Sequence, residues 1–95
     1  MTDHKPSFDD VLEILVEAVE ASTGFLNDRA IFQALAASED VALARIELDS
    51  LSTFEIIMAL EERLGLELDA DQFSPDETLH GLARMLTSSL SGHDA

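Results

Sequence analysis

One stretch in the middle of the chain has the pattern of a complete amphipathic helix with a signal at each end. It begins at Ser50, directly after Asp49, and it stops before Gly65. A short carboxylate such as that of Asp49 accepts the unpaired backbone N–H groups of a first helical turn. Gly65 can enter the left-handed conformation that commonly ends a helix, because it has no Cβ to clash. The sequence therefore predicts a helix over residues 50–64, with the Ser50 hydroxyl exposed in its first turn.

The predicted helix carries apolar side chains on two sides. With about 3.6 residues per turn, the expected core face collects Thr53, Ile56, Ile57, Leu60 and Leu64. An apolar row with an acidic border lies away from that face, and such an exposed surface indicates a docking site for partner proteins. The predicted partner-binding residues are Leu51, Phe54, Glu55, Met58, Glu61 and Glu62. The alternative for Phe54 is that it packs beneath a neighbouring loop.

The run Asp49-Ser50-Leu51, continued by Met58-Ala59-Leu60-Glu61-Glu62, resembles the acyl carrier protein family. In that family the serine of an Asp-Ser-Leu motif carries 4′-phosphopantetheine through a phosphodiester. The helix that follows the serine is the main recognition helix for partner enzymes. The resemblance is sharpest over residues 44–66 and extends to about residue 90.

The resemblance implies that the Ser50 hydroxyl receives 4′-phosphopantetheine from coenzyme A, with Asp49 and Leu51 beside it in the motif. Acyl groups would then be carried as thioesters on the thiol of this arm. The implied partners are a phosphopantetheinyl transferase and acyl-loading, acyl-transferring or condensing enzymes with basic patches. The carrier itself would supply no acid or base, so it would not be an enzyme. The competing interpretation is that Ser50 only starts a helix, a position where serine is common.

The charge of the chain limits its partners. Its 95 residues include 20 acidic and 5 basic side chains, for a formal net charge of −15. Such a surface disfavours nucleic acid and anionic membranes, and it favours basic patches on other proteins. We expect a cytoplasmic monomer that does not insert into membranes, because the chain has no apolar signal segment and no apolar run of spanning length. The chain has no cysteine, which excludes a disulfide and a thiolate metal site.

Helix signals elsewhere predict one all-α domain over residues 1–95, with an ordered core at about 7–90 and flexible tails at 1–6 and 91–95. Ser7 and Asp10 have the spacing of a capping box for a first helix that ends near residue 22. Asn27 or Asp28 can cap a short helix through residue 37, and Asp69 can cap one turn over residues 70–73. A last helix, capped by Thr78, runs to about residue 90. The expected fold is an acyl-carrier-like bundle of three main helices plus one or two short helices.

Apolar side chains at helical spacing predict the core. The inward residues of the first, short and last helices are Phe8, Val11, Leu12, Leu15, Val19, Ile31, Phe32, Leu35, Leu79, Leu82, Ala83, Leu86 and Leu90. Val41, Leu43 and Ile46 are expected to hold the loop before the motif against the core. Phe32, Leu35, Leu66, Leu68 and Phe73 could line a cleft for part of an acyl chain, or could be plain core.

One residue before the motif departs from the family pattern. Carriers commonly have a leucine, a glycine and one variable residue before Asp-Ser-Leu, whereas Ile46-Glu47-Leu48 stands here. Glycine serves where the backbone turns through positive φ. Glu47 therefore predicts a different turn before Ser50.

Three functions remain open from the sequence. The first is a discrete acyl carrier of fatty-acid, lipid or polyketide type, which Asp49 and the strong acidity favour. The second is an aminoacyl or peptidyl carrier on the same scaffold. The third is an unmodified acidic helical adaptor, for which Glu47 is the main support. A Ser-His-Asp hydrolase is excluded, because no G-x-S-x-G elbow surrounds Ser50 and nothing in the sequence brings His80 to it. Loose binding of divalent cations by clustered carboxylates is also expected.

Overall fold

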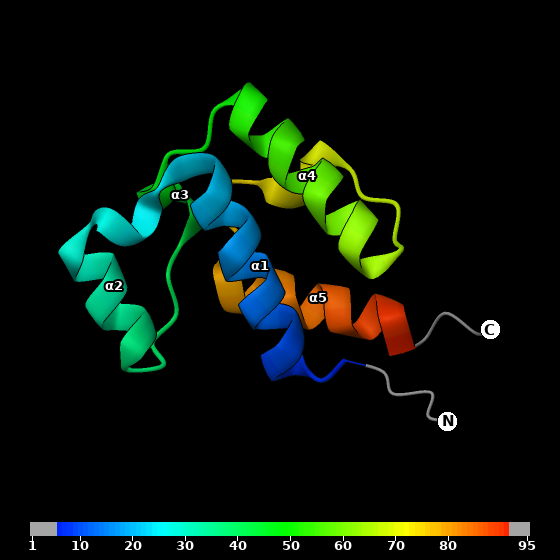
Figure 1. Ribbon diagram of the computed structural model, residues 1–95, viewed down its shortest axis with the longest axis horizontal. Helices are drawn as coiled ribbons and strands as arrows, with labels where there is room; N and C mark the ends of the chain where they lie inside the picture. Colours follow the sequence, from blue (N-terminus) through cyan, green and yellow to red (C-terminus); the bar gives the residue numbers. More distant parts are fainter. Residues whose placement is uncertain (1–5, 92–95) are drawn as a thin grey trace.

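Three long helices and two short ones, with two 3-10 turns, form the computed structural model, which describes residues 6–91 (Figure 1). In chain order the elements are α1 Phe8–Thr23, η1 Phe25–Asn27, α2 Arg29–Ala36, α3 Leu43–Ile46, α4 Ser50–Leu64, η2 Ala70–Phe73 and α5 Leu79–Ser91. The all-α bundle predicted from the sequence is confirmed. The predicted flexible tails fall mostly at residues 1–5 and 92–95, outside the described residues.

The long helices begin and end where local hydrogen bonds satisfy their terminal backbone groups. At the start of α1, the Asp10 backbone N–H donates to Ser7 Oγ at 3.2 Å, and the Ser7 N–H donates to Asp10 Oδ2 at 3.1 Å. At the start of α5, the Gly81 N–H donates to Thr78 Oγ1 at 3.0 Å. Gly24 ends α1 with φ 68° in the left-handed region. The predicted caps are therefore confirmed, because they depend only on residues a few positions apart.

The core lies where α1 packs against both α4 and α5 (Figure 1). Each of these helices contributes the apolar stripe predicted for it, although Phe8, Leu12 and Leu90 are only partly buried. The largest fully buried side chains are Leu15, Ile56, Leu60, Leu79, Leu82, Leu86, Val11, Val19 and Val41. Burying one such side chain stabilises a fold by about 1.5–3 kcal/mol. None of the helices in residues 6–91 is long and apolar enough to cross a membrane.

The short helix α2 turns one predicted core residue outward. Ile31 is buried, and Ala34 and Leu35 are partly buried on the same side. Phe32 is 54% exposed, so the prediction that it faces inward is wrong. Successive residues of a helix are rotated by about 100°, and Ile31 already occupies the inward direction. Because α2 packs mainly against η1, no other element of residues 6–91 covers its outer side, where Phe32 lies.

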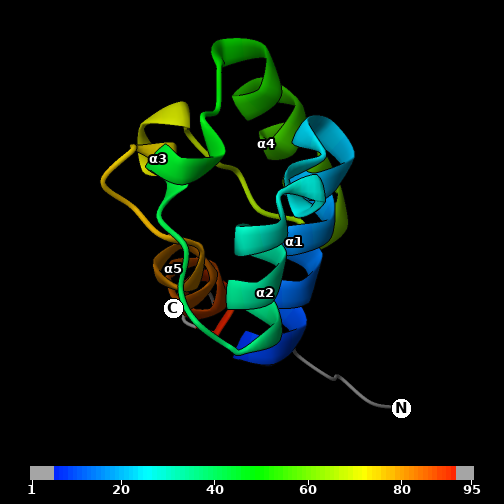
Figure 2. The ribbon, with the colours of Figure 1, turned by 90° about the vertical axis from the view of Figure 1, so that its left-hand side faces the viewer.

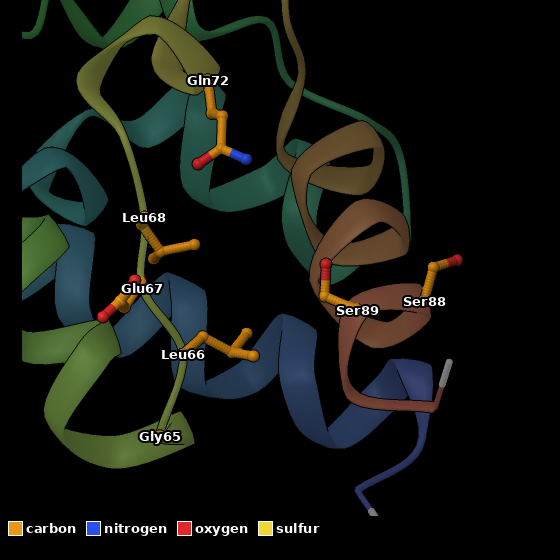
Figure 3. Close-up of a pocket in the computed structure, with 7 residues that line it drawn as sticks. All are labelled: Gly65, Leu66, Glu67, Leu68, Gln72, Ser88 and Ser89. Atoms are coloured by element: carbon orange, nitrogen blue, oxygen red, sulfur yellow. The ribbon is translucent and has the colours of Figure 1, made fainter. Parts of the chain in front are cut away.

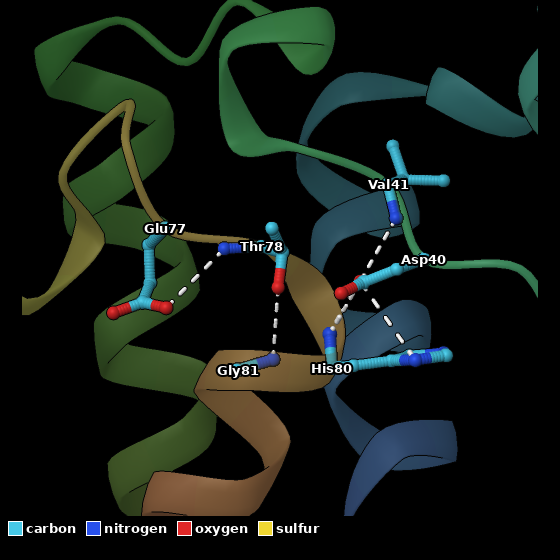
Figure 4. A network of polar contacts seen from close by, with 6 residues as sticks. All are labelled: Asp40, Val41, Glu77, Thr78, His80 and Gly81. Carbon is cyan, nitrogen blue, oxygen red and sulfur yellow. Dashed lines mark hydrogen bonds and ion pairs between the residues drawn. The ribbon is translucent and has the colours of Figure 1, made fainter.

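Hydrogen bonds join residues 40–43, around the start of α3, to residues 77–80, around the start of α5, and we call this contact the clasp. The Leu43 N–H donates to the Glu77 carbonyl, and the Leu79 N–H donates to the Val41 carbonyl, both at 2.9 Å. Asp40 Oδ1 accepts the His80 backbone N–H at 2.9 Å (Figure 4). Val41, Leu43 and Ile46 are buried, as predicted for this segment, although residues 43–46 form a helical turn rather than a loop. The clasp therefore anchors the chain just before α3, where Figure 2 shows this segment running beside α5.

Candidate functional site

Asp49 caps the helix that begins at Ser50. Its backbone is extended, and its Oδ1 accepts the Ser52 backbone N–H at 2.7 Å. Hydrogen bonds from this N–H and from the Ser52 hydroxyl hold the pKa of Asp49 below its ordinary value of 3.8. The ionised carboxylate lies at the positive end of the α4 dipole, which favours its negative charge. Gly65 ends α4 with φ 71°, as predicted.

Two serines lie in the first turn of α4, and their hydroxyls differ. The Ser52 side chain is half-buried and hydrogen-bonds to Asp49. The Ser50 side chain is exposed, and among the described residues its hydroxyl makes no hydrogen bond. Ser50 therefore presents a free hydroxyl on an ordered helix, whereas the Ser52 hydroxyl is engaged within the turn.

An open hollow of about 350 Å³ adjoins Ser50 between the first half of α4 and η2. It is lined by Leu48, Asp49, Ser50, Thr53, Phe54, Ile57, Ala70 and Phe73. A second hollow of about 280 Å³ shares Leu48 and Phe73 with the first, so the two are adjacent. The free hydroxyl and the open, mainly apolar surface beside it can accommodate a long covalent arm, so the residues present fit 4′-phosphopantetheine.

A larger hollow, of about 600 Å³, lies at the other end of α4 (Figure 3). Leu66 and Leu68 line it from the segment after α4, facing the last turns of α5. Phe73 instead lines the hollow beside Ser50, and Phe32 is exposed on α2. The five residues expected either to line an acyl-chain cleft or to be plain core therefore do not line one hollow. Phe73 is buried and Leu35, Leu66 and Leu68 are partly buried against the core, whereas Phe32 is exposed. They lie on separate elements, although the two hollows approach each other at η2, where Gln72 lines the larger one and Phe73 lines the one beside Ser50.

One side of α4 is buried and the opposite side is exposed, as predicted. Ile56, Ile57 and Leu60 are buried, and Thr53 and Leu64 are partly buried. The opposite row is exposed: Leu51 by 66%, Phe54 by 58% and Met58 by 52%. Phe54 therefore does not pack beneath a loop, and its predicted exposure is confirmed.

The acidic side chains on α4 differ in their exposure and in their hydrogen bonds to the rest of the protein. Glu62 is exposed, whereas Glu55 accepts a hydrogen bond from the Ser22 hydroxyl of α1 at 2.9 Å. Glu61 is partly buried, and its Oε2 accepts the Leu68 backbone N–H at 2.9 Å. Glu61 thus helps to hold the segment after α4, in addition to the partner-binding role predicted for it.

The turn before the site contradicts one prediction. Glu47 follows α3 with φ 61° and ψ 56°, and its N–H donates to the Leu43 carbonyl at 3.3 Å. The expectation of a different turn is therefore wrong, because Glu47 adopts the left-handed conformation that glycine would take. A left-handed residue is the usual way to end a helical turn and redirect the chain, and here it leads into Asp49.

No histidine of the described chain meets Ser50. The His80 ring contacts the Phe8 ring edge-on at 5.9 Å between centroids, and its Nδ1 is 3.9 Å from Asp40 Oδ1. His4 and His93 lie outside the described residues. Among residues 6–91, no group of three His, Cys, Asp or Glu side chains could hold a metal ion. The expected binding of divalent cations by clustered carboxylates thus finds no defined site in this part of the chain.

Comparison with known protein families gives a match. The family model described as a phosphopantetheine attachment site matches residues 9–86, a region that includes all of α4 and most of α1 and α5. Comparisons with curated proteins and with solved structures give no match. Members of the matched family carry 4′-phosphopantetheine covalently, are not catalytic, and interact with phosphopantetheinyl transferases and partner enzymes. The chain therefore belongs to the phosphopantetheine-attachment family and is an acyl-carrier-like carrier domain.

Proposed function

We propose that this chain is an acyl carrier protein in which Ser50 bears 4′-phosphopantetheine and delivers acyl groups to enzymes of fatty-acid, lipid or polyketide type. The observation that carries the proposal is the exposed Ser50 hydroxyl, which makes no hydrogen bond to the described part of the chain and lies beside an open hollow. When bound, the arm supplies a thiol that holds the acyl group as a reactive thioester.

The residues around Ser50 would position the arm and stabilise its charge. Asp49 orders the first turn of α4, which holds the Ser50 hydroxyl outward. The backbone N–H groups and the dipole at the start of α4 favour the negative charge that a phosphodiester would bring. Leu48, Thr53 and Phe73 line the adjacent hollow and would contact the part of the arm nearest the protein.

The surface of α4 supports docking by other proteins. Leu51, Phe54 and Met58 form an exposed apolar row, and Glu55 and Glu62 are exposed acidic side chains on the same helix. This combination suits an apolar partner surface bordered by Lys or Arg. The phosphopantetheinyl transferase and the acyl-loading, acyl-transferring and condensing enzymes would bind here.

Two observations favour an acyl carrier over the other interpretations. The Asp before Ser50 and the net charge of −15 favour acyl over aminoacyl cargo. The main support for the adaptor is Glu47 in place of the usual glycine, and the turn at Glu47 keeps a left-handed φ of 61°. This departure from the family pattern therefore does not alter the turn that leads to Ser50.

The attachment is tested by incubating the protein with coenzyme A and a broad-specificity phosphopantetheinyl transferase. Intact-mass analysis should show one added phosphopantetheine, and peptide mapping should locate it on Ser50. Ser50→Ala should fold, as judged by circular dichroism, and remain unlabelled. Ser52→Ala, the matched control in the same turn, should still be labelled. Labelling of Ser50→Ala would show that the assignment of the attachment site to Ser50 is wrong. An unlabelled wild-type protein would favour the adaptor.

The class of cargo needs a second measurement. The labelled protein is offered to an acyl-loading enzyme and, separately, to an aminoacyl-loading enzyme, each with its activated substrate. We expect thioester formation with the acyl-loading enzyme, detected as a second mass increase that hydroxylamine removes. Loading by the aminoacyl enzyme alone would reverse the assignment of cargo while leaving the attachment at Ser50 intact.

A further inference from the structure

Glu47 has a backbone conformation that is costly for its residue type. Its φ of 61° lies in the left-handed region, where a Cβ crowds the following carbonyl oxygen. Only Ser38 shares this property among the other non-glycine residues of the described chain, with φ 65°. A glycine would make the same turn without the crowding. The shape of the turn therefore does not explain why a glutamate is present.

Contacts within the protein do not explain the side chain either. The Glu47 side chain is exposed, and within residues 6–91 its carboxylate makes no hydrogen bond or ion pair. The nearby Arg45 is exposed as well and does not pair with it. A strained residue without a compensating internal contact motivates a functional hypothesis.

The position of Glu47 suggests what that function is. Glu47 lines the hollow of about 280 Å³ on the α3 side of Ser50, together with Ala44 and Pro75, which are exposed. This hollow shares Leu48 and Phe73 with the hollow beside Ser50. A protein that reaches the Ser50 hydroxyl from this side would approach the Glu47 carboxylate.

We propose that Glu47 is a recognition residue, whose carboxylate attracts a Lys or Arg of the protein that modifies Ser50. This inference rests on the function proposed above, and it adds a contact in the turn after α3 that is separate from the exposed surface of α4. An exposed charge beside a docking site speeds encounter with an oppositely charged partner. Arg45 would oppose this effect, because it places a positive charge two residues away.

The test measures kcat/KM for labelling by a broad-specificity phosphopantetheinyl transferase with coenzyme A. Glu47→Gln removes the charge and keeps the side-chain size, and it should lower kcat/KM by about two- to fivefold at low salt, the range expected for one exposed charge pair. The difference should disappear near about 1 M salt, where the Debye length falls to about 3 Å. Arg45→Gln should change kcat/KM in the opposite direction.

Two control variants separate this role from general effects. Glu13→Gln removes one charge from an exposed position on α1 and should leave kcat/KM near the wild-type value. Ser38→Gly relieves the other left-handed residue and should also leave kcat/KM unchanged. Melting curves should show that Glu47→Gln remains folded.

The outcomes distinguish this inference from the proposed function. If wild-type protein is labelled and Glu47→Gln matches it at low salt, Glu47 is not a recognition residue and the attachment at Ser50 stands. The same conclusion follows if Glu13→Gln slows labelling as much as Glu47→Gln, because net charge alone would then explain the effect. If wild-type protein is not labelled, the proposed function fails and this inference fails with it.

Discussion

Single residues in the turn before α4 determine how Ser50 is presented. Glu47 redirects the chain through a left-handed conformation, and Asp49 then satisfies the first turn of the helix. Ser52 is held by Asp49, which leaves Ser50 as the exposed hydroxyl of that turn. The local chemistry of four residues thus produces one accessible serine.

At this scale, Glu47→Gly should stabilise the fold slightly. Removing the Cβ relieves about 1–2 kcal/mol of left-handed strain, while the added freedom of the unfolded chain costs about 0.5–1 kcal/mol. The net gain of roughly 0.5 kcal/mol should raise Tm by about 2–4 °C. Ser38→Gly should behave in the same way, because its φ is also positive. A lower Tm for Glu47→Gly alone would mean that the Glu47 side chain makes a stabilising contact.

Helix α4 has one face that holds the fold together and another that is free to bind. Its inward face buries Ile56, Ile57 and Leu60 against the core. Its outward row is more than half exposed at Leu51, Phe54 and Met58. Substitutions on the two faces should therefore affect different properties of the protein.

Leu60→Ala should destabilise the domain, whereas Phe54→Ala should leave it folded. Truncating a buried leucine costs about 2–5 kcal/mol, and exposed substitutions usually change stability by less than about 0.5 kcal/mol. Ile56→Ala should behave like Leu60→Ala. Chemical denaturation of each variant checks the difference, and unfolding of Phe54→Ala would show that Phe54 belongs to the core.

The same face predicts effects on partner binding. Phe54→Ala should weaken recognition by a loading enzyme, and Glu62→Lys should slow association with a basic partner, less so as salt rises. Glu55→Lys should do the same, although it also removes the hydrogen bond from Ser22. Loading rates of the folded variants at two salt concentrations measure both effects. Unchanged rates for both Phe54→Ala and Glu62→Lys would remove α4 as the docking surface.

The clasp between residues 40–43 and 77–80 predicts a dependence of stability on acid. Desolvation raises the pKa of Asp40, but hydrogen bonds from the His80 backbone N–H, the Thr78 side chain and the Val41 N–H outweigh it, so the pKa lies below 3.8. Because the pKa of Asp40 is lower in the folded chain than in the unfolded chain, its ionised carboxylate stabilises the fold at pH values above the unfolded pKa. This stabilisation is lost as pH falls through the folded pKa.

Asp40→Asn should therefore have a lower free energy of unfolding than wild type at neutral pH. This gap between the two proteins should narrow below about pH 4. The asparagine keeps an acceptor oxygen for the backbone N–H groups, so it isolates the effect of the charge. Urea unfolding of both proteins between acidic and neutral pH gives the comparison. A gap that does not change with pH would show that the charge of Asp40 contributes nothing.

The whole molecule is dominated by negative charge. Twenty acidic residues face five basic ones. Arg63 and Glu17 form an ion pair at 3.0 Å that joins α4 to α1, but both side chains are about half exposed. Exposed pairs contribute at most about 1 kcal/mol, so repulsion among the carboxylates should have the larger effect on stability.

Added salt should therefore raise Tm, because screening reduces this repulsion. Millimolar Mg²⁺ or Ca²⁺ should also raise Tm. Thermal melts in NaCl and in MgCl₂ at matched ionic strength separate general screening from cation binding. An unchanged or lower midpoint in both salts would contradict the view that charge repulsion limits stability.

The sequence by itself determined the boundaries of the three long helices to within about a residue, the main core stripes and the exposed row on α4. The caps at Ser7, Asp49 and Gly65 depend on hydrogen bonds between residues a few positions apart. The core stripes follow from the spacing of apolar side chains along each helix. These features were predictable because each needs only local information.

Tertiary structure decided which surfaces are covered and where distant segments meet. Phe32 is exposed because none of the elements in residues 6–91 packs over the outer side of α2. Leu66 and Phe73 line different hollows because Leu66 follows the end of α4, whereas η2 places Phe73 beside the first half of that helix. The left-handed turn at Glu47 follows from the need to join α3 to α4, which overrides the residue's own preference. Burial and turn geometry depend on contacts between elements far apart in the chain, and the pattern of a single segment does not contain them.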